Sequence, residues 1–344
     1  MKGNQRVRLK PQELEIINDF RKFEQECKEQ GLNPESVKHG WFKTKDTSLF
    51  VKNPNFKTEE TQQVNKLQED LIKRLNEYSP KFEKIKREKS KDGHLLIIDP
   101  ADVHIGKLAS SFECGEDYNQ QIAVKRVKEG VNGILTNAKG WNIDKILFIG
   151  GNDILHTDTP KSTTTSGTSQ DTDGMWFDNF RTAIRLYCDV IEELLTVADV
   201  HFTFNPSNHD YQSGFFLAQV IEAHFRNCKN ITFDCSIAHR KYFTFGSNLI
   251  GTTHGDGAKF QDLPLLMAQE AKDWSDTNNR YIYTHHVHHK VSKDFVGVTI
   301  ESLRSPSGTD SWHHRNGYEH SPKAVEGFLH HKEFGQIARF THLF

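Results

Sequence analysis

Five short polar clusters in this 344-residue chain combine carboxylate, imidazole and amide groups at close spacing. In chain order they are Asp102-Val-His104, Gly150-Gly-Asn-Asp153, Asn208-His-Asp210, Thr253-His-Gly255 and His285-His-Val-His288. Oxygen and imidazole groups of this kind are ligands for Mn, Fe or Zn. Two cations about 3.5 to 4 Å apart need a shared carboxylate and several further ligands around them. The chain supplies both, so these residue types indicate a site for two metal ions.

Taken one at a time, the clusters also have ordinary structural explanations. Asn and Asp favour turns and helix caps, so Asn208-His-Asp210 and Gly150-Gly-Asn-Asp153 each fit a turn. The run that ends the series is harder to explain in this way. Alternate residues at a strand end project to one side, so His286 and His288 can reach a common centre. The five clusters together, in this order, favour the metal site.

The elements that must position these clusters alternate between strand and helix. Each cluster follows an apolar segment with the pattern of a strand, as Leu95-Leu-Ile-Ile98 does before Asp102. Ligands of open α/β sheets bind at the carboxyl edge, where loops turn polar groups inward. Strand-helix alternation followed by adjacent strands predicts an α/β fold with two packed β-sheets flanked by helices. The predicted strands are 95–98, 143–149, 200–204, 231–234, 241–245, 248–252, 281–284 and 296–303, with two more around 328 and 337; the predicted helices are 121–137, 176–197, 213–225 and 263–274.

The first 92 residues differ in texture and are expected to form separate units. Apolar residues at helical spacing predict an amphipathic helix over 9–31, and a second short unit follows at 33–45. Residues 1–56 are therefore expected to be a small helical module, either a helix-turn-helix that binds DNA or a module for packing or oligomerisation. Residues 57–92 carry a thin apolar stripe among many charges, which is typical of an exposed helical linker or a homodimer seam. Residues 93–344 form the predicted α/β domain.

Composition limits the class of protein. Residues 1–93 hold 21 Lys and Arg against 16 Asp and Glu, a mildly basic arm that permits contact with nucleic acid without requiring it. No segment approaches the roughly 20 apolar residues of a membrane span, and no apolar signal core follows the first Met. Five cysteines without a CxxC pair argue against a disulfide framework and a thiolate zinc site. We expect a protein of the bacterial or phage-infected host cytoplasm that makes no membrane contact.

The order of the clusters resembles the calcineurin-like metallophosphoesterase superfamily over about residues 94–290. That superfamily has Asp-x-His, Gly-Asp, Gly-Asn-His-Asp/Glu, His and Gly-His-x-His blocks, and each block has a counterpart here. Three positions depart from the pattern: Asn152 is inserted before Asp153, Ser207 replaces the Gly before Asn208, and His285 replaces the Gly of the last block. None of these departures removes a ligand.

The resemblance implies a role for each matching residue. One metal would be held by Asp102, His104, Asp153 and His288, and the other by Asp153, Asn208, His254 and His286, with Asp153 bridging. The cofactors implied are two divalent ions, with Mn expected and Fe, Zn or Mg as alternatives. The reaction implied is attack of hydroxide on phosphorus. His209 would remain free of metal as the catalytic imidazole, with Asp210 orienting its ring or serving as a structural cap.

The substrate is less constrained than the reaction. Within the superfamily the block layout looks most similar to the nuclease subunit of bacterial and archaeal double-strand-break repair complexes and to phage-type relatives, which implies a DNA phosphodiester and a nucleic-acid partner. The alternatives are a phosphatase or nucleotidase for a small phosphate ester and a non-catalytic metal-binding scaffold. His156, Asp158 and Arg315 are candidate substrate-binding residues, and the polar loop 157–174 is expected to close over the site or to lie in solvent.

Overall fold

The computed structural model describes residues 21, 23–25, 27–29, 31–43, 48–53, 66, 69–71, 73, 80–88, 90–318 and 321–344. It divides into two compact units, Met1–Arg74 and Leu75–Phe344. Most of the predicted helix at 9–31 and most of the linker at 57–92 lie outside the described residues. In the part of the chain that the structure describes, no helix has the length and hydrophobicity to cross a membrane.

The first unit contains a strand pair where the sequence predicted helices. Described residues between Arg21 and Glu29 are helical, as expected, and a short 3-10 turn, η1 (Pro34–Ser36), follows. The strands β1 (His39–Lys43) and β2 (Ser48–Lys52), however, pair antiparallel. Aromatic residues facing each other across strands stabilise such pairs, and the rings of Trp41 and Phe50 lie 5.0 Å apart. The prediction of an all-helical module is therefore wrong for these two strands, and the helix-turn-helix stays a prediction.

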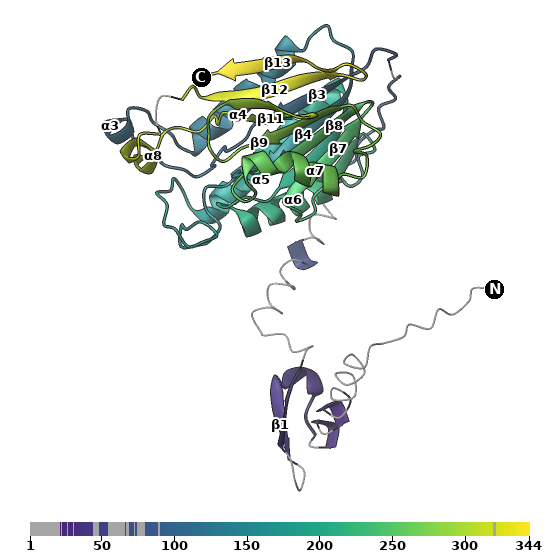
Figure 1. Cartoon of the computed structure of the whole chain (residues 1–344). Helices are drawn as coiled ribbons and strands as arrows, with labels where there is room; N and C mark the ends of the chain where they lie inside the picture. Colours follow the sequence, from purple (N-terminus) through teal and green to yellow (C-terminus); the bar gives the residue numbers. More distant parts are fainter. Residues whose placement is uncertain are drawn as a thin grey trace, which may run out of the picture. The chain divides into compact units, whose positions relative to one another are not determined.

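The second unit is built on two packed sheets flanked by helices, which confirms the predicted fold class (Figure 1). The six-stranded sheet has the order β13-β12-β3-β4-β5-β6. Its strands are β3 (His94–Asp99), β4 (Ile143–Gly151), β5 (Asp199–Asn205), β6 (Ile231–Asp234), β12 (Ala324–His331) and β13 (Gly335–Leu343). The five-stranded sheet has the order β10-β11-β9-β8-β7. Its strands are β7 (Arg240–Phe245), β8 (Asn248–Thr253), β9 (Asn279–Thr284), β10 (Val291–Phe295) and β11 (Val298–Ser302).

Alternation of side chains along β3 shows how the layers are held together. Successive residues of a strand point to opposite faces of its sheet. Leu95 and Ile97 pack between the two sheets, in a cluster that includes Ile250 and Tyr283 of the second sheet. Leu96 and Ile98 belong instead to the large core under the covering helices. Because both faces are covered, the strand is uniformly apolar, which is why its period of two is hidden in the sequence.

Helices cover the outer faces of both sheets. α4 (Gln120–Asn137), α5 (Trp176–Val197) and α6 (Tyr211–Phe225) contribute buried residues to the core on the six-stranded sheet. α7 (Leu263–Glu270), which follows the 3-10 turn η2 (Phe260–Asp262), packs Met267 against the five-stranded sheet. Two short helices, α3 (Ser111–Cys114) and α8 (Ser311–Arg315), lie in connections for which the sequence predicted no helix or strand. The predicted strand 296–303 is in fact β11, and its hairpin partner β10 was missed; the turn between them contains Gly297 with φ 78°.

The topology brings the polar clusters to one edge. β3, β4 and β5 run parallel, so the loops that follow Asp99, Gly151 and Asn205 leave from the same end of their sheet. β8 and β9 are likewise parallel, and their following loops carry His254 and the run 285–288. Backbone hydrogen bonds then join the loops, from Asp102 N–H to Asn152 O (2.8 Å) and from His285 N–H to His254 O (2.8 Å).

Candidate metal centre

Six residues of the polar clusters have a left-handed backbone, a conformation that residues other than glycine rarely adopt. They are Asp102, His104, Asn152, Asp153, His286 and His288, with φ between 50° and 71°. Among the described residues only one other non-glycine residue, Ser162, has a positive φ. Each such position costs about 1–3 kcal/mol and is kept only where the surrounding structure enforces it. This local strain marks the loops after β3, β4 and β9 as a built site.

One group of ligand atoms joins the loop after β3 to the loop after β9. Asp102, His104 and His288 each place a ligand atom within 4.8 Å of the other two. The Nε2 atoms of His104 and His288 are 3.2 Å apart, and Asp102 Oδ1 lies 3.7 Å from His288 Nε2. Asp102 and His104 are buried. Three donors therefore converge on one point, as a cation would require.

A second group joins the loops after β4, β5, β8 and β9. Asp153, His254 and His286 place ligand atoms within 4.8 Å of one another. The amide oxygen Oδ1 of Asn208 is 2.9 Å from His254 Nε2, so it reaches the same group. The four predicted ligands of the second metal are thus gathered from four separate loops.

One carboxylate oxygen of Asp153 lies between the two groups. Asp153 Oδ2 is 3.9 Å from His104 Nε2 in the first group and 3.3 Å from His254 Nε2 in the second. Asp153 is almost completely buried, with 1% of its surface exposed, so its charge cannot be balanced by solvent. All seven predicted ligands are therefore brought together, with the predicted bridging residue in the middle.

The electrostatics of the site favour a cation. Burial raises the pKa of Asp102 to about 7, and the repulsion of Asp153 acts in the same direction. Burial also opposes ionisation of Asp153, but the charge and hydrogen bond of His254 hold the pKa of Asp153 well below its usual range. Burial lowers the pKa of His104 and of His288 well below the usual value, so both rings are neutral and offer a lone pair at neutral pH.

The donor set fits divalent metal ions. Imidazoles, carboxylates and an amide oxygen match Mn, Fe or Zn, and buried carboxylates are rarely left without a partner. His254 Nδ1 is buried with no hydrogen-bond partner, 3.9 Å from Asp102 Oδ1. A buried ring nitrogen without a hydrogen-bond partner is uncommon, and a bound ion in the adjacent ligand groups would account for the charge balance around it.

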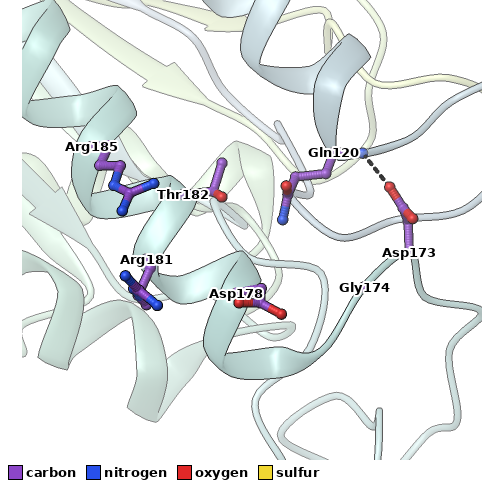
Figure 2. A pocket seen from close by; sticks show the side chains of 7 residues that line it. All are labelled: Gln120, Asp173, Gly174, Asp178, Arg181, Thr182 and Arg185. Atoms are coloured by element: carbon purple, nitrogen blue, oxygen red, sulfur yellow. Dashed lines mark hydrogen bonds between the residues drawn. The ribbon is translucent and has the colours of Figure 1, made fainter.

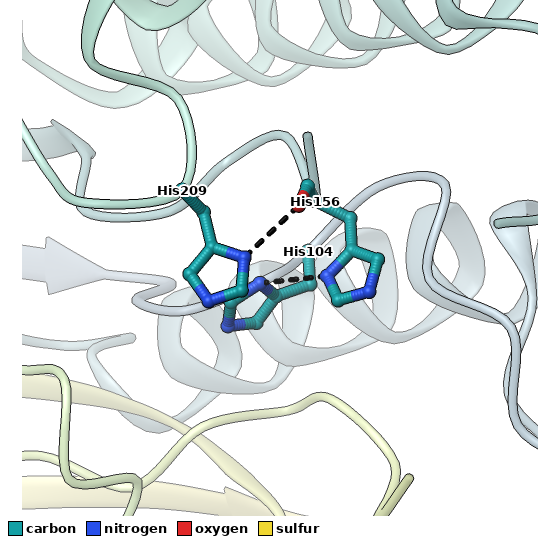
Figure 3. Close-up of side chains that lie close together, drawn as sticks. All are labelled: His104, His156 and His209. Carbon is teal, nitrogen blue, oxygen red and sulfur yellow. Dashed lines mark hydrogen bonds between the residues drawn. The ribbon is translucent and has the colours of Figure 1, made fainter. Parts of the chain in front are cut away.

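His156 holds two rings of the site in place (Figure 3). Its carbonyl oxygen lies 2.9 Å from His209 Nδ1, and its own Nδ1 lies 3.3 Å from His104 Nδ1. Ligating histidines usually donate their second N–H to a neighbour, which fixes the tautomer. His104 can donate from Nδ1 to His156 while its Nε2 faces His288. His209 can donate from Nδ1 to the carbonyl, which leaves Nε2 as its reactive atom.

Asp210 does not orient the His209 ring, and the structure corrects that expectation. Both of its oxygens are used elsewhere: Leu155 N–H donates to Oδ2 (2.9 Å) and the Ser207 hydroxyl donates to Oδ1 (2.6 Å). The same Ser207 oxygen accepts a hydrogen bond from Asp153 N–H (2.7 Å). Ser207, which stands where the family pattern has Gly, therefore links the buried Asp210 to the backbone of the bridging residue.

The two extra histidines of the last block are not placed as ligands. His285 is fully enclosed, with Nε2 2.8 Å from Asp99 Oδ2 and Nδ1 3.1 Å from Thr253 O. His289 is exposed, and its Nδ1 is 2.7 Å from Val287 O. Only His286 and His288 of this run reach the ligand groups, as the alternation of side chains predicted.

A cavity of about 950 Å³ opens over the ligands. One wall is the polar loop after β4, which contributes Thr164, Thr168 and Gln170. Two lysines, Lys107 and Lys323, also line the cavity, together with aromatic residues of α8 and the segment after it. Residues of the metal groups that line the cavity are His104, Asp153, Asn208, His286 and His288, with His209 and His156 beside them.

The three candidate substrate-binding residues lie in different environments. His156 lines the cavity. Asp158 instead accepts hydrogen bonds from the N–H groups of Gln212 and Ser213 in the first turn of α6, so its role is that of a helix cap. Arg315 is exposed and is not among the residues that line the cavity.

The two lysines of the cavity were not predicted from the sequence. Lys107 has 1% of its surface exposed and forms an ion pair with Asp310 (2.8 Å). Its position three residues after His104 was the available signal. Lys323 lies far from every cluster in the sequence, and β12 brings its segment beside β3. The spacing of residues in the sequence therefore does not link Lys323 to the site.

A second cavity of about 350 Å³ lies at the start of α5 (Figure 2). It is lined by polar side chains, among them Gln120, Asp178, Arg181 and Arg185, and it shares no lining residue with the metal cavity. Gln120 N–H donates to Asp173 Oδ2 (2.9 Å) across it. Asp178, Arg181 and Arg185 are exposed, so this hollow is a feature of the surface.

Comparison with known proteins gives fold likenesses only at a low level. No family model and no curated protein matches the chain. Among solved structures, a novel archaeal phosphodiesterase is similar over 73% of this chain and 99% of its own, with 8% identity and a TM-score of 0.34. Zinc-bound Vps29 from Entamoeba histolytica matches over 73% and 98%, at 11% identity and a TM-score of 0.29. A predicted phosphoesterase from Streptococcus pneumoniae matches over 73% and 97%, at 14% identity and a TM-score of 0.28. At these TM-scores, nothing about this chain is inferred from them.

Proposed function

We propose that this chain is a metal-dependent phosphoesterase that uses two divalent cations. The observation that carries the proposal is the position of Asp153 Oδ2, 3.9 Å from His104 Nε2 and 3.3 Å from His254 Nε2. A carboxylate oxygen between two convergent groups of ligand atoms has the arrangement of a bridging ligand. One cation would be held by Asp102, His104, Asp153 and His288, and the other by Asp153, Asn208, His254 and His286. Manganese is the proposed metal.

Cations bound there would polarise the phosphoryl oxygens and lower the pKa of the attacking water. The chain's own residues contribute the remaining steps. His209 lines the cavity, and its Nδ1 is engaged by His156 O, so Nε2 is the atom that would hold a proton for the leaving oxygen. Lys323 lines the same cavity and would attract the substrate phosphate. The N–H of His209 donates to Asp153 Oδ1 (2.9 Å), which fixes the bridging carboxylate relative to the catalytic ring.

The proposed substrate is a nucleic-acid phosphodiester, with DNA as the partner. Aromatic residues and lysines line the same cavity, a combination of side chains that receives flat bases and phosphates. The mildly basic arm of residues 1–93 is consistent with that partner. By block layout we propose a relationship to the nucleases of double-strand-break repair complexes and their phage-type relatives, and cytoplasmic action.

A nucleotidase is the second candidate. The polar loop after β4 forms one wall of the cavity, which could enclose a single nucleotide. Its backbone is tied down near the site, since Thr165 N–H donates to Asn208 O (3.3 Å). A non-catalytic scaffold is disfavoured, because His209 lines the cavity beside the ligands and a scaffold has no use for such a ring.

A panel of substrates tests the function. The full chain, supplemented with Mn²⁺, would be compared on single-stranded DNA, double-stranded DNA, RNA, nucleotides and an aryl phosphodiester, with a chelator-treated sample as control. We expect metal-dependent hydrolysis of the aryl ester and of at least one nucleic acid. Hydrolysis of nucleotides alone would favour the nucleotidase, and no hydrolysis of any substrate would contradict the proposal.

A further inference from the structure

A row of aromatic rings, each in contact with the next, leads from the ligand groups to the cavity wall. The ring of His313, in α8, stacks on the ring of His288 at 5.2 Å and 16°. Trp312 lies 5.1 Å from His313, and Tyr318 lies 5.7 Å from Trp312 at 31°. Two ring-to-ring steps therefore separate the first metal group from the Trp312 indole.

The two rings of this row that lie farthest from the ligand groups, Trp312 and Tyr318, face solvent rather than a core. Trp312 is 60% exposed and Tyr318 is 62% exposed, and both line the metal cavity. Single apolar residues on a surface need no explanation. Two aromatic rings in contact at the wall of a polar cavity present a flat apolar face to a molecule that enters it. Because both side chains are largely exposed, packing in a core does not explain why they are aromatic.

Hydrogen bonds and an ion pair connect α8, which carries Trp312, to the loop that carries His104. Asp310, just before α8, accepts hydrogen bonds from His313 N–H (2.8 Å) and His313 Nδ1 (2.7 Å) through one oxygen. Its other oxygen pairs with the buried Lys107 (2.8 Å), whose N–H donates to His104 O (3.0 Å). A chain of short contacts thus fixes the position of α8 relative to a proposed ligand, and a platform fixed in advance loses little entropy on binding.

We propose that Trp312 and Tyr318 form a stacking platform for the base of the nucleotide next to the cleaved phosphate. The inference rests on the proposed function, which it extends by naming the substrate class: a phosphodiester or phosphate monoester that carries a nucleobase. Stacking tolerates any base, because each has a π face, so no sequence preference follows. Lys323, which lines the same cavity, completes the recognition of a nucleotide unit by supplying charge for its phosphate.

Binding and turnover of matched strands test the platform. A fluorescently labelled oligothymidylate would be compared with a strand of equal length and charge in which every base is replaced by an abasic analogue. Thymidine monophosphate serves as the third ligand, to separate a nucleic acid from a free nucleotide as the source of the base. Affinities are measured in the full chain by anisotropy for the strands and by competition for the nucleotide, with Ca²⁺ replacing Mn²⁺ to limit cleavage.

The expected result is a selective loss. Trp312→Ala should weaken binding of the base-bearing strand about tenfold, and raise its KM more than it lowers kcat. The abasic strand should be unaffected, and Trp312→Phe should restore most of the affinity. Trp176→Ala, which removes an exposed indole that lines neither cavity, is the matched control.

Two outcomes would overturn the platform: equal weakening of the base-bearing and abasic strands by Trp312→Ala, or no weakening of either. Both are seen in binding, whether or not the chain cleaves the strand. Failure of the proposed function would appear separately, as absence of metal-dependent hydrolysis of the aryl ester by the unaltered chain.

Discussion

The Nδ1 atom of His209 lies 2.9 Å from the carbonyl oxygen of His156, and the side chain of the same His156 contacts His104 at 3.3 Å. One residue therefore sets the orientation of both the proposed catalytic ring and a proposed metal ligand. The backbone carbonyl can hold His209 whatever side chain residue 156 carries, whereas the contact to His104 depends on the imidazole. This separation makes the two effects distinguishable by mutation.

His209→Ala should lower kcat on an aryl phosphodiester by roughly 10²–10⁴-fold, because it removes the proposed proton donor. Metal content should stay at the level of the unaltered chain, as measured by elemental analysis. His209→Gln keeps the size of the side chain and provides the control for packing. Loss of metal in His209→Ala would instead make this residue a ligand and contradict its assignment.

His156→Ala should weaken metal binding without removing the His209 contact, since the carbonyl remains. Loss of a group that orients a ligand typically costs 10- to 100-fold in metal affinity or activity. Calorimetric titration with Mn²⁺ measures the affinity directly. Unchanged affinity would mean that the 3.3 Å contact to His104 has no orienting role.

Asp158→Ala should destabilise the fold rather than impair chemistry. Its carboxylate accepts hydrogen bonds from Gln212 and Ser213 N–H at the start of α6, and losing a cap costs about 0.5–2 kcal/mol. We expect a lower midpoint in urea unfolding and an unchanged KM for the aryl ester. A raised KM with unchanged stability would return Asp158 to the substrate site.

His330 should make stability fall in acid. Burial lowers its pKa to about 3 from the ordinary value of 6.5, so the unfolded chain binds a proton that the folded chain does not between these pH values. The contribution is complete above pH 6.5 and is lost progressively as pH falls toward 3. From pH 6.5 to 5 this residue should account for roughly 2 kcal/mol of the loss in unfolding free energy.

Urea unfolding at several pH values measures that contribution as a difference in slope. His330→Gln has no titrating ring, so its unfolding free energy should change less between pH 6.5 and 5 than that of the unaltered chain, even if the variant is less stable throughout. His330 lies 2.8 Å from the Tyr283 hydroxyl, and Tyr283→Phe removes that contact but keeps the ring, so it should retain the steep slope. Equal slopes in the His330→Gln variant and the unaltered chain would exclude this histidine as the source.

Uniformly apolar strands and polar residues at their ends allowed most of the fold and all seven proposed ligands to be located from sequence. Burial on both faces of β3 and β4 produces runs such as Leu95–Ile98 that are visible without an alignment. The contacts of Asp210 were not readable, because its partners, Leu155 N–H and Ser207 Oγ, are set by how two loops meet. The pair of β1 and β2 was missed for a related reason, since its pairing depends on register rather than helical spacing.

The cavity wall was the part least accessible to sequence reasoning. Lys323 and Trp312 line the metal cavity because of the path of the chain after β11 and the pairing of β12 with β3. No pattern in the sequence encodes such a path. The candidates named from sequence in that region were therefore chosen by charge, and Arg315 proved to be exposed.

The central claim, that Asp153 bridges two metal ions, is tested most directly by calorimetric titration of Asp153→Asn with Mn²⁺ alongside hydrolysis of the aryl phosphodiester. Asp173→Asn, a change outside the metal cavity, is the control. The unaltered chain should bind two ions, and Asp153→Asn should lose tight binding at both sites and all metal-dependent hydrolysis while it unfolds as cooperatively as the control. Binding of two ions with unchanged affinity and full hydrolysis in Asp153→Asn would contradict the account.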